Sequence, residues 1–169
     1  MLQSSWVHGN ATVVESPTDV AQVTYRGWGA DMFFAAKGES WFHIPLPTPH
    51  SVDGVTAVLE RAHLMFSTEI GDIDRVVIYD GPTELQTFAG DWESAPTTPD
   101  GLVHAIFTLD RPHPVFSGIG ITLLYVAGTN VDGRQDLARM TIAAAGADYD
   151  FPVRLEREIV DVEVVQRGR

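Results

Sequence analysis

Cysteine is absent from this chain of 169 residues, which excludes a disulfide scaffold, a thiolate metal site and a cysteine nucleophile. Basic residues are also scarce: 11 lysines and arginines stand against 23 acidic residues, and the formal net charge is −12. Binding to nucleic acid requires a basic face, so we expect no nucleic-acid partner. Acidity of this kind favours solubility.

Long apolar runs are missing as well. No run approaches the roughly 20 residues of a membrane span, and Met1–Trp6 shows neither the basic nor the apolar segment of a signal peptide. We therefore expect no membrane partner and a cytoplasmic location. The composition, with 44% hydrophobic and 20% charged residues, is that of one globular domain with its own core.

Helical periodicity is nearly absent, and strand patterns recur along the chain instead. In the segment 55–68, Ala62, Leu64 and Phe66 share one face, and the alternation shifts near Leu59, which predicts a β-bulge. Residues 119–126 are apolar on both faces and predict a central strand. Residues 139–145 predict a strand whose core-facing side chains are Met140, Ile142 and Ala144.

These patterns predict an all-β fold over residues 1–150, an antiparallel β-sandwich resembling a jelly roll. A small closed β-barrel is the alternative. Residues 151–169 form a separate β-branched tail, in which 160–164 alternate between valine and acidic residues. We predict a strand there that pairs with a neighbouring subunit in a homo-oligomer, although residues 155–159 also suit a helix.

Aromatic and histidine residues concentrate in residues 38–50, where a predicted strand ends at Pro45, Pro47 and Pro49. Prolines lack the donor that a central ladder needs, so this end should lie at a sheet margin.

Two segments share a spacing, Trp6-x-His8 and Trp41-x-His43, and side chains two apart in a strand point to the same face. If these strands meet, two indoles and two imidazoles converge, and Trp28 between its glycines adds a third indole. We therefore predict that Trp6, His8, Trp28, Trp41 and His43 bind a ligand. The alternative is that the tryptophans are core residues and the histidines are held in structural hydrogen bonds.

No cofactor is predicted. A metal at His8 and His43 alone would have too few ligands, so another histidine or a carboxylate would have to join them, and His63 and His104 lie on predicted strands that could supply one. A calcium site is the other possibility, although Asp-Gly and Gly-Pro steps are mostly turn chemistry. It would use the acidic group Asp72, Asp74 and Asp80.

No catalytic motif is present. Two serines lie near histidines in the sequence, in the pairs Ser40/His43 and Ser117/His113, but neither serine lies in a Gly-x-Ser-x-Gly elbow.

Four motifs occur in order: WVHGNA at 6–11, GWG at 27–29, WFH at 41–43 followed by PxPTP at 45–49, and VxIYDGP at 76–82. As a set they resemble a family of small bacterial and fungal proteins classed as a domain of unknown function. The resemblance covers residues 6 to about 149 and implies a compact β domain. It implies no activity, cofactor or catalytic residue.

The function predicted from these observations is a non-enzymatic binding module for a small molecule or glycan. The first alternative is a cofactor-free isomerase, cyclase or lyase with His8 and His43 in its pocket. The second is a structural subunit assembled through the tail. An enclosed apolar pocket would favour the enzyme, and an open aromatic surface would favour glycan binding.

Overall fold

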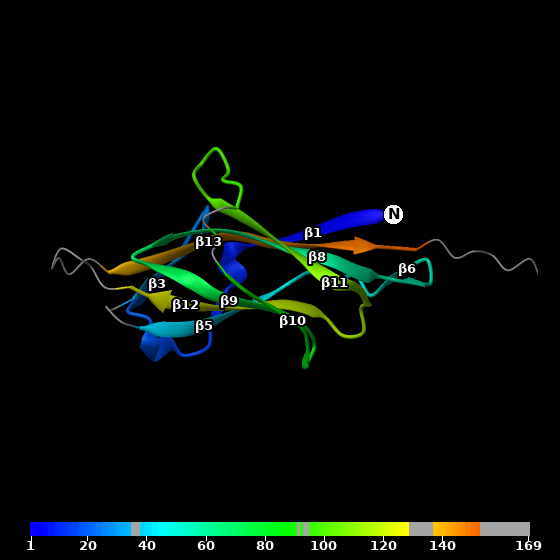
Figure 1. Ribbon diagram of the computed structural model, residues 1–169, viewed down its shortest axis with the longest axis horizontal. Helices are drawn as coiled ribbons and strands as arrows, with labels where there is room; N and C mark the ends of the chain where they lie inside the picture. The colour runs from blue at the N-terminus through cyan, green and yellow to red at the C-terminus, as the bar shows by residue number, and fades with distance from the viewer. Residues whose placement is uncertain (35–37, 91, 93–94, 129–136, 153–169) are drawn as a thin grey trace, which may run out of the picture.

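The computed structural model describes residues 1–34, 38–90, 92, 95–128 and 137–152, which fold into two antiparallel sheets packed face to face. Figure 1 shows β1, β8 and β13 in one layer and β5, β10 and β12 in the other. Sheet A contains β1 (Leu2–His8), β3 (Gln22–Arg26), β4 (Gly29–Phe34), β8 (Val58–Glu69), β11 (Val103–Pro114) and β13 (Ala138–Asp150). Sheet B contains β2 (Val13–Val14), β5 (Glu39–Pro45), β9 (Gly71–Asp80), β10 (Thr83–Ala89) and β12 (Ile119–Ala127).

Three short elements complete the described structure. The strands β6 (Ser51–Val52) and β7 (Val55–Thr56) form a hairpin of their own. Two 3-10 turns, η1 (Gly9–Ala11) and η2 (Pro17–Asp19), flank β2. None of the helices within the described ranges has the length and apolar character needed to cross a membrane.

The strand order confirms the predicted jelly-roll sandwich. Sheet A runs β11-β8-β13-β4-β3 and sheet B runs β10-β9-β12-β5-β2, so most successive long strands lie in opposite sheets. The sheets do not close on one another, so the alternative of a closed barrel is wrong. This winding decides which sequence segments share a face.

Every second side chain of the long strands points into the space between the sheets and forms the core. Phe42 and Ile44 of β5, Leu64 and Phe66 of β8, and Leu123 of β12 are all at most 2% exposed. The predicted central strand is confirmed, because β12 lies between β9 and β5. The side chains between these positions form the outer face of each sheet.

Two bulges adjust this alternation. The shift predicted near Leu59 is confirmed, because Leu59 pairs with Tyr149 and Arg61 with Asp148, which leaves Glu60 as the extra residue. A second bulge at Ala143 reverses the faces of β13 after Ile142. The prediction that Ala144 faces the core is therefore wrong. The strand also continues five residues beyond its predicted end at Ala145.

The backbone carbonyl of Ile142, beside that second bulge, is packed by two glycines. A Cβ on Gly9 would lie 1.8 Å from this oxygen, and one on Gly29 would lie 2.2 Å from it. Gly29 also has φ +149°, a conformation that disfavours other residues. The WVHGNA and GWG motifs thus supply the glycines that let η1 and β4 approach β13.

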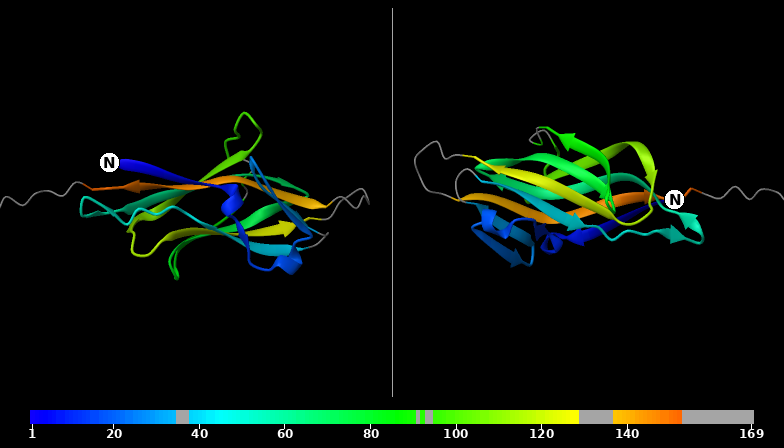
Figure 2. Two further views of the ribbon diagram at one scale, coloured as in Figure 1. Left: turned by 180° about the vertical axis from the view of Figure 1, so that it is seen from behind. Right: turned by 90° about the horizontal axis from the view of Figure 1, so that it is seen from below.

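The amino end of the chain lies beside the end of β13, as the blue and orange strands show (Figure 2). The Met1 amine is 2.7 Å from a carboxylate oxygen of Asp150 and 3.1 Å from the carbonyl oxygen of Phe151. The predicted tail strand at 160–164 lies outside the described residues.

Candidate functional site

The structure separates the two Trp-x-His pairs. Trp6 and His8 lie on β1 of sheet A, whereas Trp41 and His43 lie on β5 of sheet B. Each pair points away from the core, since the alternate residues Val7 and Phe42 belong to it. The prediction that the pairs form one cluster is therefore wrong: they lie on opposite outer faces of the sandwich.

Trp6 covers a buried imidazole. Its ring stacks on His63 with centroids 5.2 Å apart, and it lies flat because Gly146 between them has no side chain. His63 is 6% exposed, and its Nε2 lies 3.1 Å from Oδ2 of Asp148. Burial lowers the pKa of His63, and the Asp148 carboxylate opposes that effect.

Asp148 is held by further donors. The Ser4 hydroxyl and the Arg61 Nε each donate to it at 2.5 Å. Burial alone would raise the pKa of Asp148, but these hydrogen bonds and the nearby His63 hold it below its usual value. The carboxylate is therefore ionised at neutral pH.

His8 secures the turn that carries Trp28. Its Nδ1 accepts from the amide of Asn10 at 3.3 Å, so Nε2 carries the proton and donates to the carbonyl of Gly27 at 3.1 Å. Asn10 donates to the carbonyl of Arg26, and the Arg26 guanidinium lies 5.3 Å from the centre of the Trp28 ring. These contacts are structural, and ligand binding by His8 or Trp28 stays a prediction.

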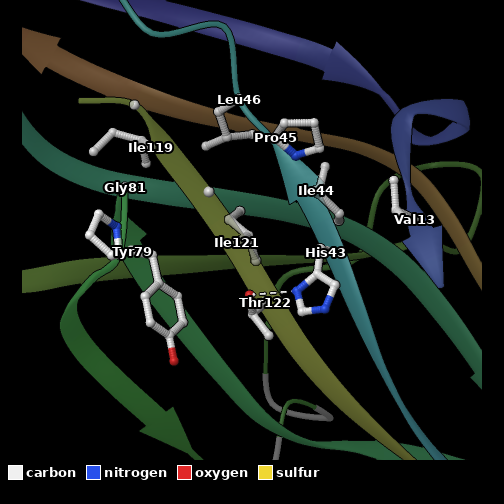
Figure 3. A pocket seen from close by; sticks show the side chains of 13 residues that line it. Val13, His43, Ile44, Pro45, Leu46, Tyr79, Gly81, Ile119, Ile121 and Thr122 are labelled. Atoms are coloured by element: carbon white, nitrogen blue, oxygen red, sulfur yellow. Dashed lines mark hydrogen bonds between the residues drawn. The ribbon is translucent and has the colours of Figure 1, made fainter. Parts of the chain in front are cut away.

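A groove crosses the outer face of sheet B, with a volume of about 680 Å³. In Figure 3, Tyr79 and His43 project the same way from strands on either side of β12. The lining is formed by Val13, His43, Ile44, Pro45, Leu46, Tyr79, Gly81, Pro82, Gly118, Ile119, Gly120, Ile121 and Thr122.

Gly120 forms the floor of this groove. It lies in β12 directly between Tyr79 of β9 and Pro45 of β5. A Cβ on Gly120 would meet only the carbonyl oxygen of Ile44, at an ordinary 3.8 Å. Neither packing nor backbone conformation therefore requires glycine here, and its effect is to leave the face open between two ring side chains.

Thr122 and His43 line one side of the groove, and Glu15 contacts His43 from outside the lining. The two ring nitrogens of His43 are 3.0 Å from the Thr122 hydroxyl and 3.0 Å from a carboxylate oxygen of Glu15. The side chain of His43 is 41% exposed and that of Glu15 is 53% exposed, so both can reach a ligand. They present a hydroxyl, an imidazole and a carboxylate beside an apolar floor.

Asp80 shapes the far end of the groove. It is 3% exposed and accepts hydrogen bonds from the amides of Phe116, Ser117 and Gly118. Burial raises its pKa, but these amides and His113 outweigh burial and hold the pKa below the usual value. The carboxylate thus fixes the loop that leads into β12, in agreement with the turn chemistry weighed against calcium.

Sequence reasoning found part of this face. His43 lines the groove, and Trp41 extends the same outer face one row further, opposite Leu124. Tyr79, Gly120 and Glu15 were missed. A glycine inside an apolar strand was the available signal, because it often marks a close approach by a ligand. The Ser40/His43 pair is no dyad, since the two side chains point to opposite faces of β5.

Comparison with known proteins identifies a family but no activity. A family model described as "Family of unknown function (DUF6623)" matches residues 1–154. No curated protein matches the chain.

Solved structures with a similar fold include carbohydrate-binding modules. A CBM29-2 mutant has 10% identity and a TM-score of 0.43, over 88% of this chain and 86% of its own. The CBM36-1 domain of a multidomain xylanase from the hindgut metagenome of Trinervitermes trinervoides has 10% identity and a TM-score of 0.39, over 86% and 96%. Similarity at this level carries no information about the ligand.

Proposed function

The chain belongs to DUF6623, a family of unknown function, and we propose that it is a binding module that holds a neutral glycan in the groove across sheet B. The proposal rests on the architecture of that groove alone. It places the ligand on the face that carries His43 and Trp41, opposite the face that carries Trp6 and His8.

The observation that carries the proposal is the unfilled position at Gly120. A strand glycine weakens a sheet, and alanine would fit here with contacts no closer than 3.8 Å. The glycine therefore costs stability without a packing benefit, as expected where a ligand must lie close to the backbone. The Tyr79 ring and the Pro45 ring flank it, and sugar rings pack on such surfaces.

Charge and polarity favour a neutral sugar over other small ligands. The described groove lining contains no lysine or arginine, and the protein carries a net charge of −12, so anionic ligands are repelled. Thr122, His43 and Glu15 supply donors and acceptors for hydroxyl groups. The groove is open along the sheet, which suits a chain of sugars that extends beyond it.

The test uses affinity gel electrophoresis in separate gels that contain mannan, xylan, β-glucan or α-glucan. We expect one of these neutral polysaccharides to retard the wild-type protein. Gly120→Val places a branched side chain over the floor and should weaken the affinity at least about tenfold, or ~1.4 kcal/mol. Its thermal stability should be unchanged or higher, because a β-branched residue replaces glycine in a strand.

The matched control is Ile106→Ala, which removes an exposed side chain, 48% accessible, from the outer face of sheet A. Its retardation should equal that of the wild type. Tyr79→Phe should retain most of the affinity and Tyr79→Ala should lose several-fold of it. Absence of retardation by all four polysaccharides, or full retardation of Gly120→Val, would contradict the proposal.

A further inference from the structure

The outer face of sheet A, opposite the groove, brings two histidines into contact. Trp6, Gly146, His63 and Ile106 form one row across β1, β13, β8 and β11, and His104 lies two residues before Ile106 on the same face. Nδ1 of His63 is 3.3 Å from Nε2 of His104, and the ring centroids are 5.4 Å apart. The groove makes no use of these residues.

From this geometry we propose that His63 and His104 bind a single late transition-metal ion, copper or zinc, beneath the indole of Trp6. Two nitrogens bound tetrahedrally to one zinc ion at about 2.0–2.1 Å lie about 3.3–3.4 Å apart. The two imidazole nitrogens therefore already have the separation that a shared ion requires, without movement of the backbone.

The carboxylate behind His63 is the partner that metal-binding histidines use. Asp148 approaches Nε2 at 3.1 Å, so the proton belongs on that nitrogen and the lone pair of Nδ1 points to His104. Ser4 and Arg61 fix the carboxylate in turn. Among the described residues, Nε2 of His63 has no well-formed hydrogen bond although the residue is only 6% exposed, and a small rotation of the ring on metal binding would align it with Asp148.

The indole of Trp6 and the thioether of Met65 indicate which class of ion the two histidines would bind. Trp6 stacks on His63 and is tilted by 57° to His104, with centroids 5.9 Å apart, so an ion between the two imidazoles lies close to the indole, whose ring favours a nearby cation. Met65 lies directly opposite His104 on the same face and offers a thioether. Among the described residues no three His, Asp or Glu side chains converge, so imidazole and thioether ligands favour copper, then zinc, over calcium or magnesium.

The test titrates the untagged full chain with Zn²⁺, Cu²⁺ and Ca²⁺ by calorimetry. We expect one saturable site for Zn²⁺ and Cu²⁺ and none for Ca²⁺. His104→Gln should weaken that site at least about tenfold. His50→Gln is the matched control, since it removes an exposed histidine that belongs neither to the groove lining nor to the histidine pair. Its affinity should equal that of the wild type.

Histidine-ring ¹⁵N spectra of the wild type provide a second readout that needs no variant. Zn²⁺ should shift the signals of His63 and His104 and leave those of His8 and His113 in place. The proposal is overturned if no saturable site is found, if His104→Gln binds as tightly as the wild type, or if other histidines shift instead. The pair is then a hydrogen-bonded contact only, and glycan binding to the opposite face is unaffected by that result.

Discussion

Single side chains with several backbone partners decide much of this fold, and Asp80 shows how. Its two oxygens accept three amides and face His113 from a site that is almost fully buried. An amide side chain in its place would turn an NH₂ group toward at least one of those N–H donors. The loop between β11 and β12 depends on this carboxylate.

We predict that Asp80→Asn lowers the free energy of unfolding at pH 7 by about 1–3 kcal/mol. The folded pKa of Asp80 lies below the unfolded value of about 3.9, so its contribution is fully present above that pH. As the pH falls through the folded pKa, the contribution is lost. Urea unfolding between pH 7 and pH 2 should show the two proteins converging in acid.

The control for this prediction is Asp74→Asn. The Asp74 side chain is 53% exposed and pairs loosely with Arg75 at 3.9 Å, so its removal should leave stability unchanged. If the difference in unfolding free energy between Asp80→Asn and the wild type stays constant down to pH 2, the ionised carboxylate is not the source of the stability.

The glycine of the WVHGNA motif gives a steric prediction. Gly9→Ala places a Cβ 1.8 Å from the carbonyl of Ile142, and we expect a loss of about 1–3 kcal/mol or more. Gly27→Ala is the matched control, because nothing lies within 4 Å of its Cβ. Thermal melts should show a large fall for Gly9→Ala and almost none for Gly27→Ala. Equal melting temperatures would mean that the chain relaxes around the clash.

At the level of residues, the sequence could suggest which side chains share a strand face but not which strands meet. Alternation places His63 with Met65 and His104 with Ile106. That His63 and His104 are partners follows from the pairing of β8 with β11, whose residues are some forty positions apart. Pairing over such distances leaves no local signal.

Among the strands, β13 carries the largest share of the pairing. Over its 13 residues it pairs with β8 on one side and with β4 and then β1 on the other. By contrast, β6 and β7 pair with no other described strand than each other, through a turn at Asp53 and Gly54.

We therefore predict that native-state amide exchange is slowest in β13 and fastest at the β6–β7 hairpin. Amides bonded within a central strand exchange only when the sheet opens, whereas a two-residue hairpin opens locally. The measurement is hydrogen exchange by NMR, with protection factors compared at Ala145, Ala147 and Val55. Comparable protection at Val55 and Ala147 would contradict the ranking.

The elements themselves were largely predictable. Alternation identified the core face of β8, the apolar run at 119–126 identified β12 as a central strand, and the shift of pattern located the bulge at Glu60. The Ala143 bulge lies in a run of three alanines, Ala143–Ala145, where hydrophobicity alone cannot show a change of face. The bulge coincides with the point where the partner of β13 changes from β4 to β1.

For the whole molecule, charge separates the domain from the tail. Residues 153–169 contain four arginines and four acidic residues, so the net charge of −12 belongs to residues 1–152. A domain of that charge repels its own copies at low ionic strength. Any self-association should then depend on the tail.

We predict that deletion of residues 153–169 converts a multimeric species to a monomer in light scattering. The reason is the alternating β-branched pattern at 160–164, which suits pairing with a sheet edge of another subunit. A second variant replaces Val162 and Val164 by lysine within the full chain, and it should also be a monomer. If the number of subunits per particle is the same with and without residues 153–169, the tail has no role in assembly.

The winding of the sandwich also explains why the two Trp-x-His pairs do not form the predicted cluster. The two Trp-x-His segments have the same local pattern, but a jelly roll places β1 and β5 in opposite sheets. The two Trp-x-His pairs therefore lie on outer faces on opposite sides of the core, although their local sequence patterns are the same. Topology, which composition and spacing do not encode, decides whether such residues meet.

The meeting of Met1 with Asp150 and Phe151 has a consequence for engineering. Because β13 ends beside the start of β1, residue 151 can be joined to residue 1 by a short linker in a variant without residues 152–169, and the chain reopened at Asp53–Gly54. The same short distance between residues 1 and 151 allows the sandwich to be inserted into a surface loop of a host protein without separating the two ends of that loop. Such a fusion would display the groove and the histidine pair on opposite sides of one rigid insert.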